Sequence, residues 1–228
     1  AKVKLILNGV NITTPDDAPI FIKNAAKAII YLQPGSSNTL TDGSASTRDG
    51  AIHCKTKLTI FGGGTLNVTG YVDDAINAEG GIIIDDGVFN LKALECGVKS
   101  DIHVTINGGS FTINVGNDGM HGDDALTING GYINVGQSTE GLEAAVITMT
   151  AGTVHVVSYD DGLNCASDLM SNSHRFVMKG GYIYLNANGD GLDVNGPFEM
   201  SSGVVIVDVF FSCGNGPLDY TGIFPMSG

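Results

Sequence analysis

The chain has 228 residues, with 33 glycines, no tryptophan and a formal net charge of −13. Such acidity argues against nucleic acid or an anionic membrane surface as a direct partner, and it favours divalent cations. No apolar run approaches the ~20 residues that span a bilayer, so membrane insertion is not expected.

Residues 1–50 contain short strand-like segments at irregular spacing, which predicts one or two wide coils of a repeating β structure. Strand-like segments at 4–12, 18–22 and 28–32 are separated by turns. No signal peptide is visible and Ala1 leads directly into a strand, so we expect a mature piece whose leader has been removed. No segment has a convincing helical period, and a terminal helix cap is not predicted.

A sequence repeat is clearest between residues 102 and 144, where the same pattern of apolar residues and glycines occurs twice. Ile106 and Phe111 recur 22 residues later as Ile128 and Ile133. Apolar residues alternate as in strands, and Gly-Gly turns separate the first two strands of each copy. Three short strands in a fixed period of this length predict one coil of a parallel β-helix.

The same pattern continues along the chain, so we predict an all-β, single-domain parallel β-helix with coils of about 22 residues. Its expected parts are looser N-terminal coils at 1–50, regular coils at 51–197 and a C-terminal cap at 198–228. An inserted loop at 169–175 accounts for one long coil. The buried positions of the third strand are predicted to stack in one column: Ile52, Ile76, Val98, Met120, Leu142, Leu163 and Leu192.

The four cysteines, Cys54, Cys96, Cys165 and Cys213, occur in different coils. Coils stack about 4.8 Å apart, so cysteines two coils apart are ~10 Å from each other, beyond disulfide reach. We therefore expect free thiols and no disulfide partner, with Cys54 and Cys165 pointing inward.

Two polar columns flank the third strand, one just before it and one directly after its buried position. Equivalent carboxylates on stacked coils are expected about 5 Å apart, where two charges repel by ~3 kcal/mol at an effective dielectric near 20. The whole chain has only 11 lysines and arginines to balance them. Calcium, which takes six to eight oxygen ligands, suits such a ladder. The candidate ligands are Asp49, Asp73, Asp74, Asn77, Asp118, Asp123, Asp124, Glu140, Glu143, Asp160, Asp161, Asp190 and Asp193. The alternative is that these acids are solvated turn residues.

The outward positions of the second strand form another candidate surface. Asn134, His155 and Tyr184 follow one another there, with Tyr132 and Tyr182 at strand starts. A flat face of amides and aromatic rings matches a linear polysaccharide, whose rings stack and whose hydroxyls need hydrogen-bond partners. The alternative is an asparagine ladder that satisfies itself.

No nucleophilic triad is visible, so no catalytic residue is assigned. A polysaccharide lyase would need a base beside calcium, and Lys99 is the only basic residue in the acid-flanked column apart from histidines. The other interpretation of Lys99 is an ion-pair partner for Asp74 and Asp118.

Three N-terminal segments, 7–13, 38–43 and 58–68, resemble a family of bacterial carbohydrate-binding domains, as do the repeat ends at 161–163 and 190–192. The resemblance implies a right-handed parallel β-helix akin to calcium-dependent pectate lyases. It also implies a secreted or cell-surface protein that binds cellulose and acidic sugars such as polygalacturonate. The chain departs from the pattern where Glu95-Cys96 replaces the acid-Gly turn.

These observations favour an extracellular, non-catalytic protein that binds plant cell-wall polysaccharide and contains structural or bridging calcium. Two alternatives stay open: a calcium-dependent, pectate-type lyase, and a structural surface solenoid that binds no glycan.

Overall fold

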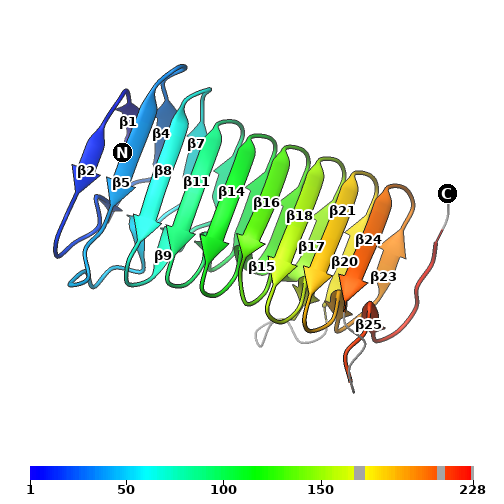
Figure 1. The fold of residues 1–228 in the computed structure, drawn as a ribbon. Helices are drawn as coiled ribbons and strands as arrows, with labels where there is room; N and C mark the ends of the chain where they lie inside the picture. The colour runs from blue at the N-terminus through cyan, green and yellow to red at the C-terminus, as the bar shows by residue number, and fades with distance from the viewer. Residues whose placement is uncertain (167–172, 210–213, 227–228) are drawn as a thin grey trace.

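A computed structural model describes residues 1–166, 173–209 and 214–226. Over these residues the chain is all-β with no helix, and it forms a parallel β-solenoid of about 9 turns of roughly 23 residues (Figure 1). None of the described segments is a helix long and apolar enough to cross a membrane. The predicted fold class is confirmed.

The solenoid has three strand positions in each coil. The first position holds β1 (Lys2–Leu7), β4 (Lys27–Leu32), β7 (Leu58–Phe61), β10 (Ile82–Ile84), β13 (His103–Ile106), β20 (Arg175–Met178) and β23 (Phe198–Met200). The second holds β2 (Asn11–Thr13), β5 (Ser37–Thr41), β8 (Thr65–Gly70), β11 (Val88–Ala93), β14 (Ser110–Val115), β16 (Tyr132–Gln137), β18 (Thr153–Ser158), β21 (Tyr182–Ala187) and β24 (Val204–Val209). The third holds β3 (Ile20–Ile22), β6 (Gly50–Cys54), β9 (Asp74–Ala78), β12 (Val98–Ser100), β19 (Leu163–Cys165), β22 (Leu192–Val194) and β25 (Leu218–Tyr220).

Two long strands, β15 (Met120–Ile128) and β17 (Leu142–Met149), run through the corner between the third position of one coil and the first position of the next. They therefore join these two positions into one 16-stranded sheet, while the second position forms a separate 9-stranded sheet.

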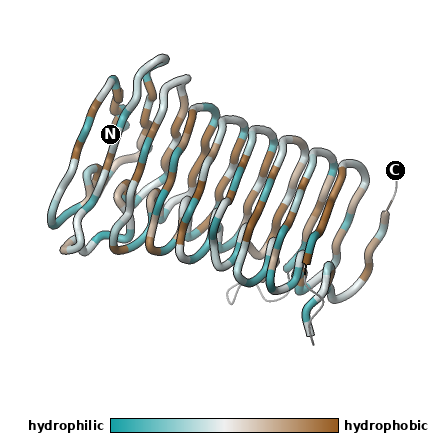
Figure 2. The backbone as a smooth tube through the Cα atoms, in the orientation of Figure 1, coloured by the Kyte–Doolittle hydropathy of each residue, from teal (hydrophilic) through white to brown (hydrophobic). Residues whose placement is uncertain are grey.

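The predicted column of the third position is confirmed, and the first and second positions stack in register in the same way. In the third position Ile52 pairs with Ile76, and Val98 pairs with both Ile76 and Met120. In the second, Phe89 pairs with Phe111, and their rings stack with centroids 4.6 Å apart. Figure 2 shows apolar and polar residues alternating along the coils, as expected where every second side chain points into the core. Each coil thus buries its apolar side chains mainly against its two neighbours.

Turn glycines let neighbouring coils approach closely. Gly131 has φ +89°, and a Cβ atom there would lie 2.7 Å from the carbonyl oxygen of Gly109 in the preceding coil. The Gly-Gly pairs of the repeat are needed at this turn because both the backbone angle and the space exclude a side chain.

The last residues continue the repeat before they cover its end. In β25, Leu218 pairs with Leu192 of β22, so the coil that starts at Phe198 is completed. Phe224 then stacks on Phe198 at 4.3 Å, and Met226 bridges to Met200. Part of the predicted loop at 169–175, and Cys213, lie outside the described residues. Cys54, Cys96 and Cys165 are buried free thiols, and the predicted inward positions of Cys54 and Cys165 are confirmed.

Candidate functional site

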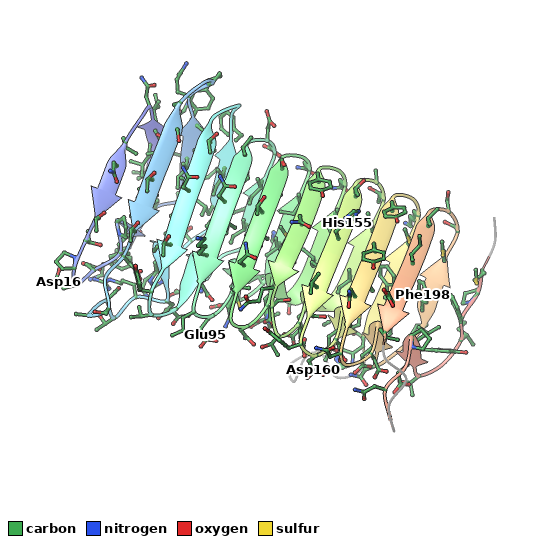
Figure 3. The ribbon with its side chains drawn as sticks, in the orientation of Figure 1. Asp16, Glu95, His155, Asp160 and Phe198 are labelled. Carbon is green, nitrogen blue, oxygen red and sulfur yellow. The ribbon has the colours of Figure 1, made fainter. Side chains whose placement is uncertain are left out.

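Polar side chains form a column directly after the buried position of the third strand. Strand pairing aligns His53, Asn77, Lys99, His121, Glu143, Asn164 and Asp193 on successive coils. The turns before these strands carry the acids, and Glu95 and Asp160 mark that edge of the solenoid in Figure 3. Side-chain contacts divide the column into separate groups.

The first group surrounds Asp74, whose side chain is fully buried. Its two carboxylate oxygens accept hydrogen bonds from the Asn77 amide and from the backbone N–H of Cys96, both at 2.8 Å. Burial raises the pKa of Asp74 to about 6. The Asn77 Oδ1 atom is buried and has no hydrogen-bond partner. Asp73, half-buried next to it, also has a raised pKa, mainly through burial and then through Asp49. Together these groups present hard oxygen donors and too little positive charge to balance them.

The second group joins Asp49 to His53 and Glu79. His53 Nε2 lies 3.7 Å from an Asp49 oxygen and 3.5 Å from Glu79 Oε1. Glu79 also forms an ion pair of 2.5 Å with Lys55. Neither His53 nor Glu79 was among the predicted ligands, so the structure places Asp49 in a mixed nitrogen and oxygen group.

The third group is built on His121, whose two ring nitrogens both face carboxylates. Asp118 and Glu143 each lie 2.9 Å from Nδ1, and Asp123 lies 2.9 Å from Nε2. Burial by itself would lower the pKa of His121, but its hydrogen bonds to Asp118 and Glu143 raise it to about 10. His121 is therefore an imidazolium that balances part of this acid cluster.

Lys99 does not have the predicted contacts. Within the described part of the chain it forms no ion pair within 4.0 Å, and Asp118 pairs with His121 instead. Burial would lower the pKa of Lys99, yet Asp74 and the other acids around it raise it overall.

The fourth group lies on the following coils, around Glu140. The Asn164 amide donates to both Glu140 oxygens at 3.0 and 2.9 Å, while Asn164 Oδ1 is buried without a partner. Burial, followed by repulsion from Glu143, raises the pKa of Glu140 to about 8. Burial also raises the pKa of Asp161 to about 6, although Asp161 accepts the N–H of Asp190 at 2.6 Å.

The remaining predicted acids lie at the margins of this fourth group. Burial, then repulsion from Asp219, Asp190 and Asp160, raises the pKa of Asp193. Asp190 itself accepts the N–H of Gly216 at 2.6 Å. The side chain of Asp124 joins none of the four groups in the described structure. The predicted ladder is thus discontinuous.

The predicted aromatic surface is a compact cluster on the outer face of the second sheet, where Figure 3 labels His155. The centroid of the His155 ring lies 5.7 Å from Tyr132, 5.8 Å from Tyr182 and 5.9 Å from Tyr184. Asn134 pairs directly with His155 in the register. We call these five residues the aromatic face.

The self-satisfying ladder that we considered as the alternative occurs on β5, β8 and β11, and not on the aromatic face. Asn90 donates to Asn67 at 2.8 Å, and Asn67 donates to the backbone carbonyl of Asn38. A further ladder, which sequence reasoning missed, runs along the turns from Asp85 through Asn107 and Asn129 to Thr150. The Asn-Gly-Gly sequence that recurs at this turn of the repeat could have predicted this second ladder. These amides are already paired, which leaves the aromatic face as the better candidate for a ligand.

Comparisons with known proteins concern the family and the fold of the chain. A family model described as carbohydrate-binding domain-containing protein matches residues 1–137 and 116–210. A protein of that description from Acetivibrio thermocellus is 34% identical over an alignment of 97 residues, which covers 39% of this chain and 34% of the relative. The match thus spans about a third of that relative's length. A gadolinium derivative of a polysaccharide lyase-like protein from C. thermocellum has a similar structure, with a TM-score of 0.52 and 22% identity over 99% of this chain and 75% of that chain. At that identity the likeness concerns the fold.

Proposed function

We propose that this chain, which belongs to the family of carbohydrate-binding domain-containing proteins, binds a linear polysaccharide on the aromatic face without cleaving it. The observation that carries the proposal is the His155 ring surrounded by three tyrosine rings across β16, β18 and β21. Aromatic rings that are exposed on one side offer apolar surface to the faces of sugar rings. The Tyr132 and Tyr182 hydroxyl groups and the Asn134 amide provide donors and acceptors for sugar hydroxyls, and the Tyr184 hydroxyl, which donates to Asp208 at 3.3 Å, can still accept.

The acid groups support a second part of the proposal, calcium. Burial raises the pKa values of Asp74 and Glu140, and neighbouring acids add to the shift, so both carboxylates are poorly solvated when they are ionised. The unpartnered amide oxygens of Asn77 and Asn164 lie in the same two groups. Carboxylate and amide oxygens are the ligands that calcium takes. The donor sets therefore fit calcium, held by Asp73, Asp74 and Asn77 in one group and by Glu140, Asn164 and Asp161 in the other.

Calcium at these places explains how an acidic protein could bind acidic sugars. A chain of net charge −13 repels a polyanion such as polygalacturonate through its long-range field. An ion whose protein ligands leave a coordination position open accepts a uronate oxygen and bridges the two negative partners. Cellulose is neutral, so its binding needs only stacking and hydrogen bonds. Because such plant cell-wall polymers are extracellular, we propose that the protein acts as a secreted or cell-surface protein.

Affinity electrophoresis in gels that contain either hydroxyethyl cellulose or polygalacturonate tests whether acidic sugars need calcium and cellulose does not. We expect chelation to abolish retardation by polygalacturonate while retardation by the cellulose derivative persists. Circular dichroism of the chelated protein checks that it stays folded. If a chelated protein that is still folded were retarded by neither polymer although the calcium-loaded protein is retarded by both, separate modes of binding for cellulose and polygalacturonate would be contradicted. Retardation by neither polymer would favour a structural solenoid, and unsaturated products absorbing in the ultraviolet would favour a lyase.

A further inference from the structure

The second acid group contains a histidine that the glycan and calcium proposals do not use. The His53 side chain is only 3% exposed, and both of its ring nitrogens are buried without a hydrogen-bond partner. Burying an imidazole in this way is costly, because each unpaired polar atom loses its hydration and gains nothing in return. Among the histidines for which ring contacts are described, His121 shows the opposite case, with both nitrogens 2.9 Å from carboxylates.

The unpartnered ring is directed at two carboxylates. Nε2 lies 3.7 Å from Asp49 Oδ2 and 3.5 Å from Glu79 Oε1, too far for good hydrogen bonds. The three donor atoms all lie within 4.8 Å of one another. Two ligands bound tetrahedrally at about 2.1 Å from one zinc ion are about 3.4 Å apart. The two separations from Nε2, 3.7 and 3.5 Å, are therefore close to those of ligands around a common ion.

The surroundings hold the imidazole in this orientation. The Phe21 ring, one coil before, packs on His53 with centroids 5.1 Å apart. The Arg48 guanidinium lies 3.8 Å from the Phe21 centroid and forms an ion pair with Asp17. On the other side, Asn77 pairs with His53 in the register. Asp49 and Glu79, in contrast, lie at the surface and can adjust to an ion.

We propose that Asp49, His53 and Glu79 bind a first-row transition metal ion of the zinc type. An imidazole nitrogen favours zinc, copper, nickel or iron, whereas calcium takes oxygen ligands and needs six to eight of them. Two carboxylates and one imidazole leave a coordination position for water or a ligand. The competing cation is Lys55, whose ammonium group lies 2.5 Å from Glu79 Oε1 and whose side chain is 40% exposed. It can move into solvent when a metal ion binds Glu79.

Isothermal titration of the full chain with ZnCl2, in saturating calcium, tests the proposal. We expect a zinc-binding event that weakens at least tenfold in both His53→Gln and Asp49→Asn. Lys55→Met, which removes the competing charge, should tighten it severalfold. His121→Gln is the matched control, since it removes an imidazole from the other cluster of acids and histidine, and it should leave this event unchanged. Asp49 is 59% exposed, so Asp49→Asn decides the question if His53→Gln does not fold.

Three results would overturn the assignment. The first is unchanged zinc affinity in folded His53→Gln or in Asp49→Asn. The second is a zinc event that only His121→Gln removes. The third is a zinc-binding event that is seen without calcium but disappears in saturating calcium, which would show that the site prefers a hard cation. Glycan binding takes no part in this experiment, so its outcome is independent of the polysaccharide proposal.

Discussion

Replacement of Glu140 by glutamine should stabilise the protein at pH 8 in the absence of calcium. Burial and the neighbouring acids raise the pKa of Glu140 from 4.5 to about 8 in the folded state. The folded protein therefore holds this proton more tightly than the unfolded chain does. The resulting stability is fully present below pH 4.5 and is lost as the pH rises towards 8.

The size of the effect follows from the shift. At 1.36 kcal/mol for each pKa unit, ionisation of Glu140 would cost about 4 kcal/mol at pH 8, and we take about 2 kcal/mol because the side chain is partly open to solvent. Glutamine removes this cost. Its amide oxygen can still accept a hydrogen bond from the Asn164 amide, which donates to both Glu140 oxygens in the wild type.

Urea unfolding at pH 5 and pH 8, with chelator present, measures the difference. The glutamine variant should match the wild type at pH 5 and exceed its free energy of unfolding by about 2 kcal/mol at pH 8. Glu95→Gln, which removes the same charge from an exposed turn, should change little at either pH. Saturating calcium should reverse the order, since a folded-state ligand at a hundredfold excess over Kd adds about 2.7 kcal/mol and the variant has lost a ligand. Equal pH dependence in the two proteins would refute this account of the acid groups.

Two further predictions concern the solenoid itself, and urea unfolding checks both. Phe111→Ala should cost about 3–5 kcal/mol, because it leaves a cavity against the stacked ring of Phe89, whereas Thr112→Ala on the outward side of the same strand should stay within about 0.5 kcal/mol. Equal losses would contradict the inward and outward assignment. Gly131→Ala should destabilise more than Gly35→Ala, since both glycines have positive φ but only Gly131 faces a backbone oxygen at 2.7 Å, while nothing lies within 4 Å of a Cβ at Gly35. The strain shared by both variants is about 1–2 kcal/mol, so similar losses would show that close stacking of turns is unimportant.

Strand register could be predicted from the sequence because two periods reinforce each other. Alternation decides which side chains face inward, and the fixed repeat length decides which of them stack, so Ile52, Ile76 and Val98 could only form one column. A shift of the strand register by one residue would have moved the apolar side chains of a whole strand from the core to the surface. The aromatic face follows from the same logic, since its members are outward positions of adjacent strands.

Contacts within the acid columns could not be predicted in the same way. Lys99 and His121 are neighbours in one column, and a long side chain on either coil reaches the same acids. Which of them pairs with Asp118 depends on side-chain rotamers and burial, which the repeat does not encode. The sequence therefore identified the acids without their partners.

Glu79 was missed because it follows the third strand, outside the two columns considered. The sequence nevertheless contains a pattern that could have identified Glu79. Glu79, Asp101 and Asp123 occupy the same position after the strand in three consecutive coils. Alternation puts each of them on the same face as the column residue two positions earlier. The contact between Glu79 and His53 is therefore a diagonal one between adjacent coils.

The central claim, glycan binding by the aromatic face, is tested most directly by depletion of the protein from solution by insoluble cellulose. We expect the wild type to be depleted, Tyr184→Ala and His155→Ala to bind at least tenfold more weakly, and Tyr159→Ala to bind as the wild type does. Tyr159 is the matched control because its ring is 67% exposed and lies outside the aromatic face. Wild-type affinity in both Tyr184→Ala and His155→Ala, or an equal loss in Tyr159→Ala, would contradict the account.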